Sequence, residues 1–164
     1  LQPKVIEKLI KDNTLPTRLY VSVNTSNKEA YDKFHRSLKE HAWEKLNETL
    51  QLFKKIKKPN TTVFRINLVK DLNMENEHAK EFAQMIKDSE PAFIEFKGFM
   101  SVGFARERLG YDRMPTHEEM LEFISKIEKE LGGTGYVLQD EHKPSRAYVL
   151  CKRKEDLLIK EEDY

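Results

Sequence analysis

Three segments of the chain carry polar side chains that could bind a charged small molecule. The segments Arg18–Val23, Thr62–Val69 and Ala92–Met100 are rich in β-branched and aromatic residues, which is typical of strands. Because side chains alternate across a strand, each segment has one apolar face and one face with a polar pair near its carboxyl end. The polar pairs are Ser22 with Asn24, Arg65 with Asn67, and Glu95 with Lys97.

Two interpretations fit this polar face. One is the water-facing side of a sheet with a few structural ion pairs, and the other is a barrel lumen that binds a charged ligand. Ligands of parallel α/β proteins bind at the carboxyl ends of the strands, where these pairs lie, and this position favours the lumen. Glu95 and Lys97 are expected about 6.6 Å apart along one strand face, so each should pair mainly across the sheet. Arg65 is the expected partner of Glu95.

A second candidate site follows the third strand segment, in what we expect to be a loop. Basic residues alternate there with the aromatic residues Phe104 and Tyr111, a combination that suits single-stranded RNA. In the competing interpretation, Glu107 and Asp112 neutralise the arginines and the loop only closes the fold. The arginines are Arg106, Arg108 and Arg113.

A lysine-rich run, residues 54–58, lies at the expected end of a helix. Cations at that position complement the helix dipole, so a structural role is the simpler interpretation. The run is nevertheless the next candidate for RNA contact.

Composition excludes several classes of protein. The 29 basic and 28 acidic residues nearly cancel, so the chain is not a generic polycation that coats nucleic acid. The single cysteine, Cys151, excludes an internal disulfide framework and an all-cysteine metal site. No apolar run approaches the roughly 18–20 residues of a membrane helix. The chain starts at Leu1 without a methionine or a signal peptide, so we expect it to be a piece of a longer protein.

Helical periodicity separates the strand segments. Capping boxes are expected at Ser26 with Glu29 and at Thr116 with Glu119, and Gly132 suits a helix end. Alternating strands and helices predict an α/β fold with parallel neighbouring strands and right-handed crossovers. Three such strands are few for a complete fold and suggest half of a barrel or of a doubly wound sheet. The expected helices cover residues 3–11, from about 27 onward, 43–56, 77–88 and 116–131, and a terminal hairpin pairs 136–138 with 147–151.

Several segments resemble the C-terminal half of the tRNA 4-demethylwyosine synthases, the radical SAM enzymes of wybutosine biosynthesis. They are RLYVSVNTSNKEAYDKFHRSL, AWEKLNETLQLF, TTVFRINLVKDLNM, FIEFKGFMSVGFARERLGYDRMPTHEEM and KPSRAYVLCKR. The resemblance covers residues 1–153, and residues 93–119 are its most specific part. It implies a domain over residues 1–153, the C-terminal part of a partial (β/α) radical SAM barrel (TIM-barrel-like) with a small terminal hairpin. Residues 154–164 would form a charged tail, frayed or folded as a short helix.

The resemblance also implies a reaction. Cysteines in the missing N-terminal half would hold one or more [4Fe–4S] clusters, one of which cleaves S-adenosylmethionine (SAM) reductively. The enzyme, a carbon–carbon lyase by class, would condense pyruvate-derived carbons with N1-methylguanosine in tRNA(Phe). Electrons would come from a flavodoxin-like domain or protein, with FMN in a separate domain of eukaryotic members. We expect a cytoplasmic enzyme, at the endoplasmic reticulum surface in some eukaryotes, and an isolated chain that binds no cluster and is inactive.

The resemblance suggests roles for individual residues. Lys97 and Glu95 are the expected catalytic residues in the lumen. Asn24-Thr25-Ser26 stands where the family often has Asp-Ala-Pro, and Arg36-Ser37-Leu38 stands for Arg-Pro-Leu. No metal ligand is expected in this chain. The expected SAM-binding residues are Ser22, Asn24, Arg65 and Asn67, and the expected tRNA-binding residues are Arg106, Arg108, Arg113 and Tyr111.

Two other functions stay open at this point. A non-catalytic RNA-binding module would need only the basic segment after the third strand. A different (β/α)-barrel lyase could use Lys97 in an aldolase-like reaction. A C-x-x-x-C-x-x-C motif in the upstream coding sequence would favour the radical SAM enzyme over both.

Overall fold

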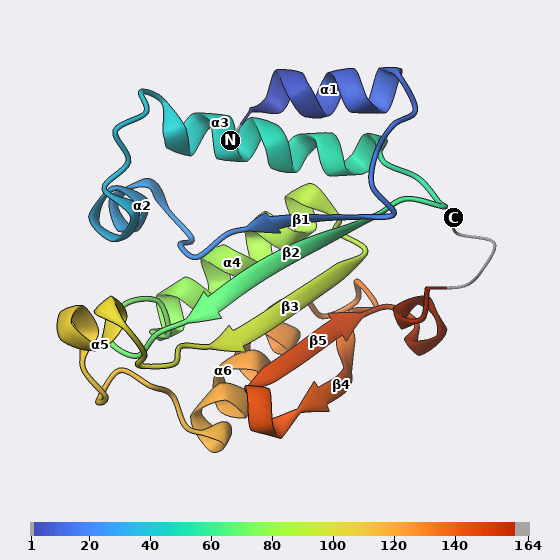
Figure 1. Ribbon diagram of the computed structural model, residues 1–164. Helices are drawn as coiled ribbons and strands as arrows, with labels where there is room; N and C mark the ends of the chain where they lie inside the picture. The colour runs from blue at the N-terminus through green and yellow to red at the C-terminus, as the bar shows by residue number, and fades with distance from the viewer. Residues whose placement is uncertain (1, 160–164) are drawn as a thin grey trace.

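The computed structural model describes residues 2–159, and a single mixed sheet of five strands organises them (Figure 1). The strand order is β1-β2-β3-β5-β4. Strands β1 to β3 are parallel, and the hairpin β4–β5 joins β3 in antiparallel orientation. The α/β class, the three parallel strands and the terminal hairpin are confirmed. The strands are β1 (Arg18–Ser22), β2 (Thr61–Leu68), β3 (Phe93–Gly98), β4 (Val137–His142) and β5 (Ala147–Cys151).

The helices cover one face of the sheet and its β1 edge. Figure 1 shows α4 and α6 behind the strands, while α3 lies beyond β1 with α1 packed against it. Helix α2 and the short helix α5 lie beyond the carboxyl ends of β1 to β3. The α-helices are α1 (Pro3–Lys11), α2 (Lys28–His35), α3 (Ala42–Gln51), α4 (Asn76–Ser89), α5 (Phe104–Leu109) and α6 (His117–Glu130). The 3₁₀ turns are Leu52–Lys55, Lys143–Ser145 and Lys154–Leu157.

The covered face of the sheet forms the main core. Val21, Phe64, Ile94 and Leu150 lie in register across four strands, and the last three are completely buried. They pack in the same cluster as apolar residues of α4 and α6. Each fully buried side chain of this size contributes about 1.5–3 kcal/mol through the hydrophobic effect. The prediction that the apolar strand faces receive the helices is therefore confirmed.

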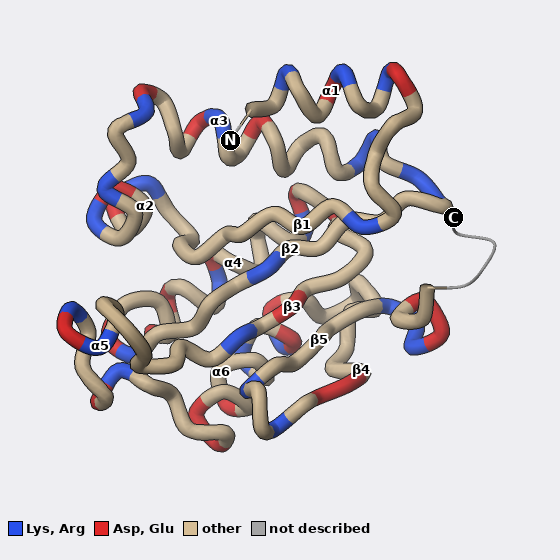
Figure 2. The backbone as a smooth tube through the Cα atoms, in the orientation of Figure 1, with Lys and Arg blue, Asp and Glu red and all other residues tan. Residues whose placement is uncertain are grey.

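The opposite face of the sheet is polar toward the carboxyl ends of the parallel strands, and no α-helix lies over that part among the described residues. Nearer the amino ends, Val63, Phe93 and Cys151 form a small apolar cluster against Leu157. Ser22, Arg65, Glu95 and Val149 lie in register across it, with Ser22 exposed and the other three half-buried. Figure 2 shows charged positions within β2 and β3, in the middle of the sheet. Removing charged groups from water is costly unless polar partners replace the water. The charged side chains on this face therefore need either water or a further polar layer above the sheet.

Some local predictions need correction. Asn27, not Ser26, caps α2, because Asn27 Oδ1 accepts a hydrogen bond from the backbone N–H of Ala30 at 2.8 Å. The capping box of Thr116 and Glu119 is confirmed at α6. The segment after β3 contains a helix, α5, rather than a loop throughout, and this places Arg106 and Arg108 on that helix. The start of the tail folds as a 3₁₀ turn, and residues 160–164 lie outside the described residues.

Candidate functional site

An ion pair between neighbouring strands lies at the centre of the polar face. Arg65 and Glu95 are register partners on β2 and β3. Arg65 donates from Nη2 and Nε to Glu95 Oε2 at 2.9 and 3.2 Å. The Arg65 guanidinium also lies over the ring of Tyr20, 4.5 Å from its centroid. The predicted pairing of Arg65 with Glu95 is confirmed, and the arginine is fixed between β1 and β3.

Lys97 is held far less firmly. Its Nζ lies 3.9 Å from Glu95 Oε1, on the same strand, and its side chain is 37% exposed. The prediction that Lys97 pairs across the sheet is wrong, because its register partners are Asn67 on β2 and Ala147 on β5, and neither carries a charge. The ammonium group is thus directed to the open face with one long ionic contact. This arrangement leaves it available to an anionic ligand.

Asn24 has a structural role in addition to its predicted one. Its Oδ1 accepts a hydrogen bond from the backbone N–H of Asn67 at 3.1 Å, at the carboxyl end of β2. The buried Asn73 donates through Nδ2 to the carbonyl oxygens of Asn24 and Asn67, both at 2.8 Å. Asn73 Oδ1 also accepts from the N–H of Val69. Asn73 therefore closes the carboxyl ends of β1 and β2, and the sequence analysis missed it.

The side chains of Ser22, Asn24 and Asn67 retain free hydrogen-bonding groups. Ser22 is exposed, and Asn67 is half-buried. Within residues 2–159, no hydrogen bond involves the Ser22 hydroxyl, the Asn24 side-chain NH₂ or the Asn67 carboxamide. These groups can therefore donate to, or accept from, a polar ligand on the open face.

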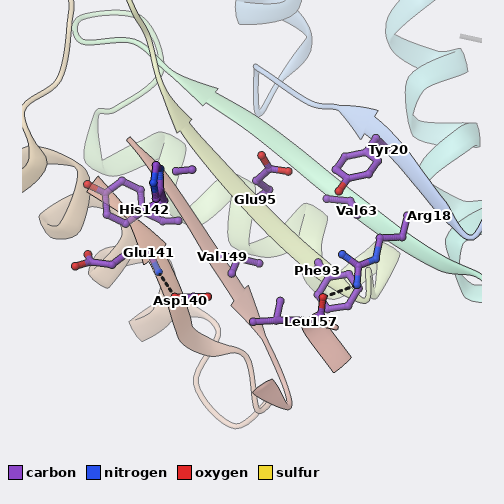
Figure 3. Close-up of a pocket in the computed structure, with 12 residues that line it drawn as sticks. Arg18, Tyr20, Val63, Phe93, Glu95, Asp140, Glu141, His142, Val149 and Leu157 are labelled. Carbon is purple, nitrogen blue, oxygen red and sulfur yellow. Dashed lines mark hydrogen bonds between the residues drawn. The ribbon is translucent and has the colours of Figure 1, made fainter. Parts of the chain in front are cut away.

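A hollow of about 490 Å³ opens on the same face, nearer the amino ends of the parallel strands (Figure 3). Glu95 lines it, together with Tyr20 and the hairpin residues Asp140, Glu141 and His142. Arg18 borders the hollow, donates to the carbonyl oxygen of Leu157 at 2.6 Å and lies over the Phe93 ring. The sequence analysis predicted the hairpin but not that its acidic strand would form a wall of this hollow.

Tyr148 joins the hollow to the helical layer. Its ring is buried, and its hydroxyl lies 2.6 Å from Nδ1 of His117 at the start of α6. Burial raises the pKa of Tyr148, with a smaller contribution from the nearby Glu141 carboxylate. The phenol therefore stays protonated and serves as a hydrogen-bonding group rather than as an anion.

The three predicted RNA-binding arginines differ in their surroundings. Arg106 donates through Nε to the carbonyl of Ser101 at 3.2 Å, and its guanidinium lies over the Tyr111 ring at 5.0 Å. Arg113 is half-buried, and its Nη1 donates to the carbonyl of Leu109 at 3.1 Å. Arg113 thus contributes to the loop structure, whereas Arg108 is exposed.

The neutralisation of these arginines by Glu107 and Asp112 finds no support in the described residues. No ion pair joins either acid to Arg106, Arg108 or Arg113 there. The positive charge at α5 is therefore not cancelled by direct contacts, and Figure 2 shows Lys or Arg positions in this part of the chain.

A polar cluster at the start of α2 was also missed. Ser26 Oγ donates to Glu81 Oε2 at 2.5 Å and lies 2.7 Å from His78 Nδ1. Asn27 Nδ2 donates to the same Glu81 oxygen at 2.8 Å. These contacts attach the segment after β1 to α4. They explain why Ser26 does not cap α2, since its hydroxyl is already engaged.

Comparisons with known proteins identify relatives of this chain. The family model described as "Wyosine base formation" matches residues 88–152, which include β3, α5, α6 and the hairpin. The S-adenosyl-L-methionine-dependent tRNA 4-demethylwyosine synthase of Pyrococcus abyssi is 35% identical over 150 residues, 92% of this chain and 42% of that protein. The Saccharomyces cerevisiae protein of the same name is 31% identical over 93% of this chain and 19% of its own length. The resemblance to the tRNA 4-demethylwyosine synthases is confirmed.

Structural comparison agrees with this family. A solved structure of TYW1 with a lysine-pyruvate adduct bound superposes with a TM-score of 0.74 at 26% identity, over 93% of this chain and 44% of that one. The chain thus spans less than half the length of the demethylwyosine synthases it matches. Within residues 2–159, no helix is long and apolar enough to cross a membrane, and no group of three metal-ligating His, Cys, Asp or Glu side chains occurs.

Proposed function

We propose that this chain is part of a radical SAM enzyme that condenses pyruvate-derived carbons with N1-methylguanosine in tRNA(Phe) to give 4-demethylwyosine. The observation that carries the proposal is the polar row of Arg65, Glu95 and Lys97 on the uncovered face of the sheet. The relatives are more than twice as long as this chain, so the rest of the protein is available to cover that face. The sheet would then form part of a partial (β/α) barrel, with the polar row in its lumen.

The free polar groups at the carboxyl ends of β1 and β2 fit SAM. A hydroxyl and two carboxamides can hydrogen-bond a ribose or an amino-acid group, which are the polar parts of that molecule. We assign this role to Ser22, to the NH₂ group of Asn24 and to Asn67, with Arg65 nearby as a fixed positive charge. When bound and reductively cleaved, SAM supplies the radical that starts the reaction.

The iron–sulfur cluster does not fit on this chain. Cys151 is buried, and burial raises the pKa of its thiol, so it is a poor metal ligand. We propose that the cluster ligands lie outside this chain, in the rest of the protein, and that electrons come from a flavodoxin-like domain or a separate protein, with FMN in a separate domain in some members of the family. We place the enzyme in the cytoplasm.

Lys97 and Glu95 are the proposed catalytic residues. The TYW1 structure that resembles this chain holds a lysine-pyruvate adduct, so that protein binds pyruvate at a lysine. In this chain we propose that the Lys97 ammonium binds the pyruvate carboxylate, since its one ionic contact, to Glu95, is long and its side chain faces the open side. Glu95 would hold both Lys97, on the same strand, and Arg65, on the neighbouring β2, in place and contact the substrate between them.

The basic segment at α5 is the proposed tRNA contact. Arg106 and Arg108 can bind phosphates through bidentate guanidinium hydrogen bonds. Arg113 and Tyr111 remain predicted contacts, although Arg113 also stabilises the loop and Arg106 covers one side of Tyr111.

The proposal is tested with the full-length protein, reconstituted without oxygen. It is supplied with SAM, a reductant, ¹³C-labelled pyruvate and tRNA(Phe) that carries N1-methylguanosine. We expect the labelled tricyclic base in the digested tRNA by mass spectrometry. SAM cleavage without any modified base would overturn the proposal in favour of another radical SAM reaction. RNA binding by a full-length protein that lacks a cysteine triplet would overturn it in favour of a binding module.

A further inference from the structure

Three apolar side chains are exposed on the segment that leads from β3 into α5. Met100, Val102 and Phe104 are 48%, 59% and 83% exposed, whereas Ser101 between them is buried. We call these three side chains the apolar ridge. Ser101 points inward and its carbonyl accepts a hydrogen bond from Arg106 Nε at 3.2 Å, so the three apolar side chains are directed outward.

The ridge lies beside arginines that have no acidic partner among residues 2–159. Arg106 donates to the carbonyl of Ser101, the buried residue between Met100 and Val102. Arg108 is exposed and lies four residues after Phe104, one turn further along α5 from that ring. Exposed apolar side chains next to unpaired cations match the chemistry of RNA, which offers base faces and phosphates together. An apolar protein partner would leave these charges without compensation.

The two aromatic residues of the segment are not equivalent. The Arg106 guanidinium lies over the Tyr111 ring at 5.0 Å and covers one of its faces. No comparable contact covers Phe104 in the described part of the chain, and it is the more exposed of the two. Phe104, rather than Tyr111, therefore has a free ring face on which a base could stack.

We infer that Phe104 stacks on an unpaired base of the tRNA while Arg106 and Arg108 hold the adjacent phosphates, with Tyr111 keeping Arg106 in place. This inference rests on the proposed function. Helix α5 lies beyond the carboxyl ends of the parallel strands, where the lumen would open (Figure 1). A base that leaves the anticodon stack to enter the lumen leaves neighbours unstacked. A phenyl ring at the rim replaces part of that lost stacking.

The test compares substitutions at Phe104 in the full-length protein. The probe is an anticodon stem–loop RNA of tRNA(Phe) with N1-methylguanosine. Phe104→Ala should weaken binding by about 5- to 150-fold, the range expected for one base–aromatic stack. Phe104→Leu should behave like Phe104→Ala, because it keeps apolar volume but loses the π face, whereas Phe104→Trp should retain the affinity. Leu158→Ala, at an exposed apolar residue outside α5, is the matched control and should bind normally.

Other readouts separate stacking from packing against the rest of the protein. The dependence of affinity on salt should stay the same in Phe104→Ala, since no phosphate contact is lost, and the thermal unfolding midpoint should not move. Wild-type affinity in both Phe104→Ala and Phe104→Leu would overturn the inference and leave the proposed function intact. A second outcome would also overturn the inference: Phe104→Ala lowers both the unfolding midpoint and the RNA affinity, and Phe104→Leu has wild-type values of both. Phe104 would then act through packing and not through stacking. A wild-type protein that fails to bind this RNA would overturn both.

Discussion

Gly98 and Arg146 fasten the terminal hairpin to β3. The N–H of Gly98 donates to the carbonyl oxygen of Arg146 at 2.9 Å, and a Cβ on Gly98 would lie only 3.0 Å from Arg146 Cβ. Arg146 in turn donates through Nη1 to the carbonyl of Pro115, before α6. The contact therefore joins β3, directly after Lys97, to the hairpin and to the segment before α6.

Gly98→Ala should destabilise the protein by about 1–3 kcal/mol, because the added methyl group must displace a closely packed neighbour. Arg146 has φ +47, so Arg146→Gly relieves the clash at no backbone cost. The double variant should lose less stability than the two single changes summed, measured by urea unfolding of the full-length protein. Strict additivity of the two changes would show that the residues do not interact as described.

Contacting residues have coupling energies of roughly 0.5–3 kcal/mol. The coupling energy of Arg65 and Glu95 should lie in the lower part of this range, because the Arg65 side chain is 39% exposed and water screens the pair. The measurement is a double-mutant cycle of Arg65→Met and Glu95→Gln by the same urea unfolding. The control cycle uses Lys126 and Glu122, an exposed pair on α6 whose coupling should be smaller. Equal coupling in the two cycles would mean that the open face is as well solvated as an ordinary helix surface.

His35 should make stability depend on pH. Burial lowers the pKa of His35, so the unfolded chain binds a proton more readily than the folded one. The stability that the neutral His35 contributes to the folded state is therefore fully present above the pKa of the unfolded chain, about 6.5. It is lost as the pH falls through the lower pKa of the folded state. His35→Phe, which keeps the ring against Tyr31, should flatten the stability profile below pH 6.5. The exposed His142 is the control: an equal flattening in His142→Phe would contradict burial as the cause.

Arg106→Ala combined with Arg108→Ala should weaken tRNA binding and reduce the slope of log affinity against log salt by about 0.7–0.9 for each lost phosphate contact. SAM cleavage without tRNA should persist, since α5 lies outside the polar row. Lys126→Ala on the outer helix α6 should leave the slope unchanged. If the double variant binds tRNA with the wild-type slope, α5 is not part of the interface and the lysine run 54–58 becomes the next candidate.

Much of the sheet could be predicted because strand alternation is a local property. The register that brings Glu95 beside Arg65 follows from the apolar residues Phe64, Ile66, Ile94 and Phe96, which must face the helices, and a slip by one residue would bury the charges. Lys97 was placed on the correct face for the same reason. Its partner was not predictable, because strand alternation does not tell which uncharged residues flank it in the assembled sheet.

The remaining errors involve residues that satisfy backbone groups over longer distances. Asn73 closes the ends of two strands from a turn, and nothing in its neighbourhood distinguishes it from a surface asparagine. Ser26 and Asn27 are both good helix caps, and the choice between them depends on Glu81, over fifty residues away. Helix α5 is too short to show a clear apolar periodicity, and its exposed Phe104 gives no sequence signal of burial.

The most direct test of the catalytic lumen is the turnover of Lys97→Met in the full-length enzyme, with Lys126→Met on the outer surface as the matched control. We predict that Lys97→Met lowers the kcat for 4-demethylwyosine formation by about 100-fold or more, because a substrate without its anchor loses the reacting geometry. The thermal unfolding midpoint should stay within the range of the control, since Lys97 has only one long ionic contact. Near-normal turnover in Lys97→Met would contradict the assignment of the open polar face as the catalytic lumen.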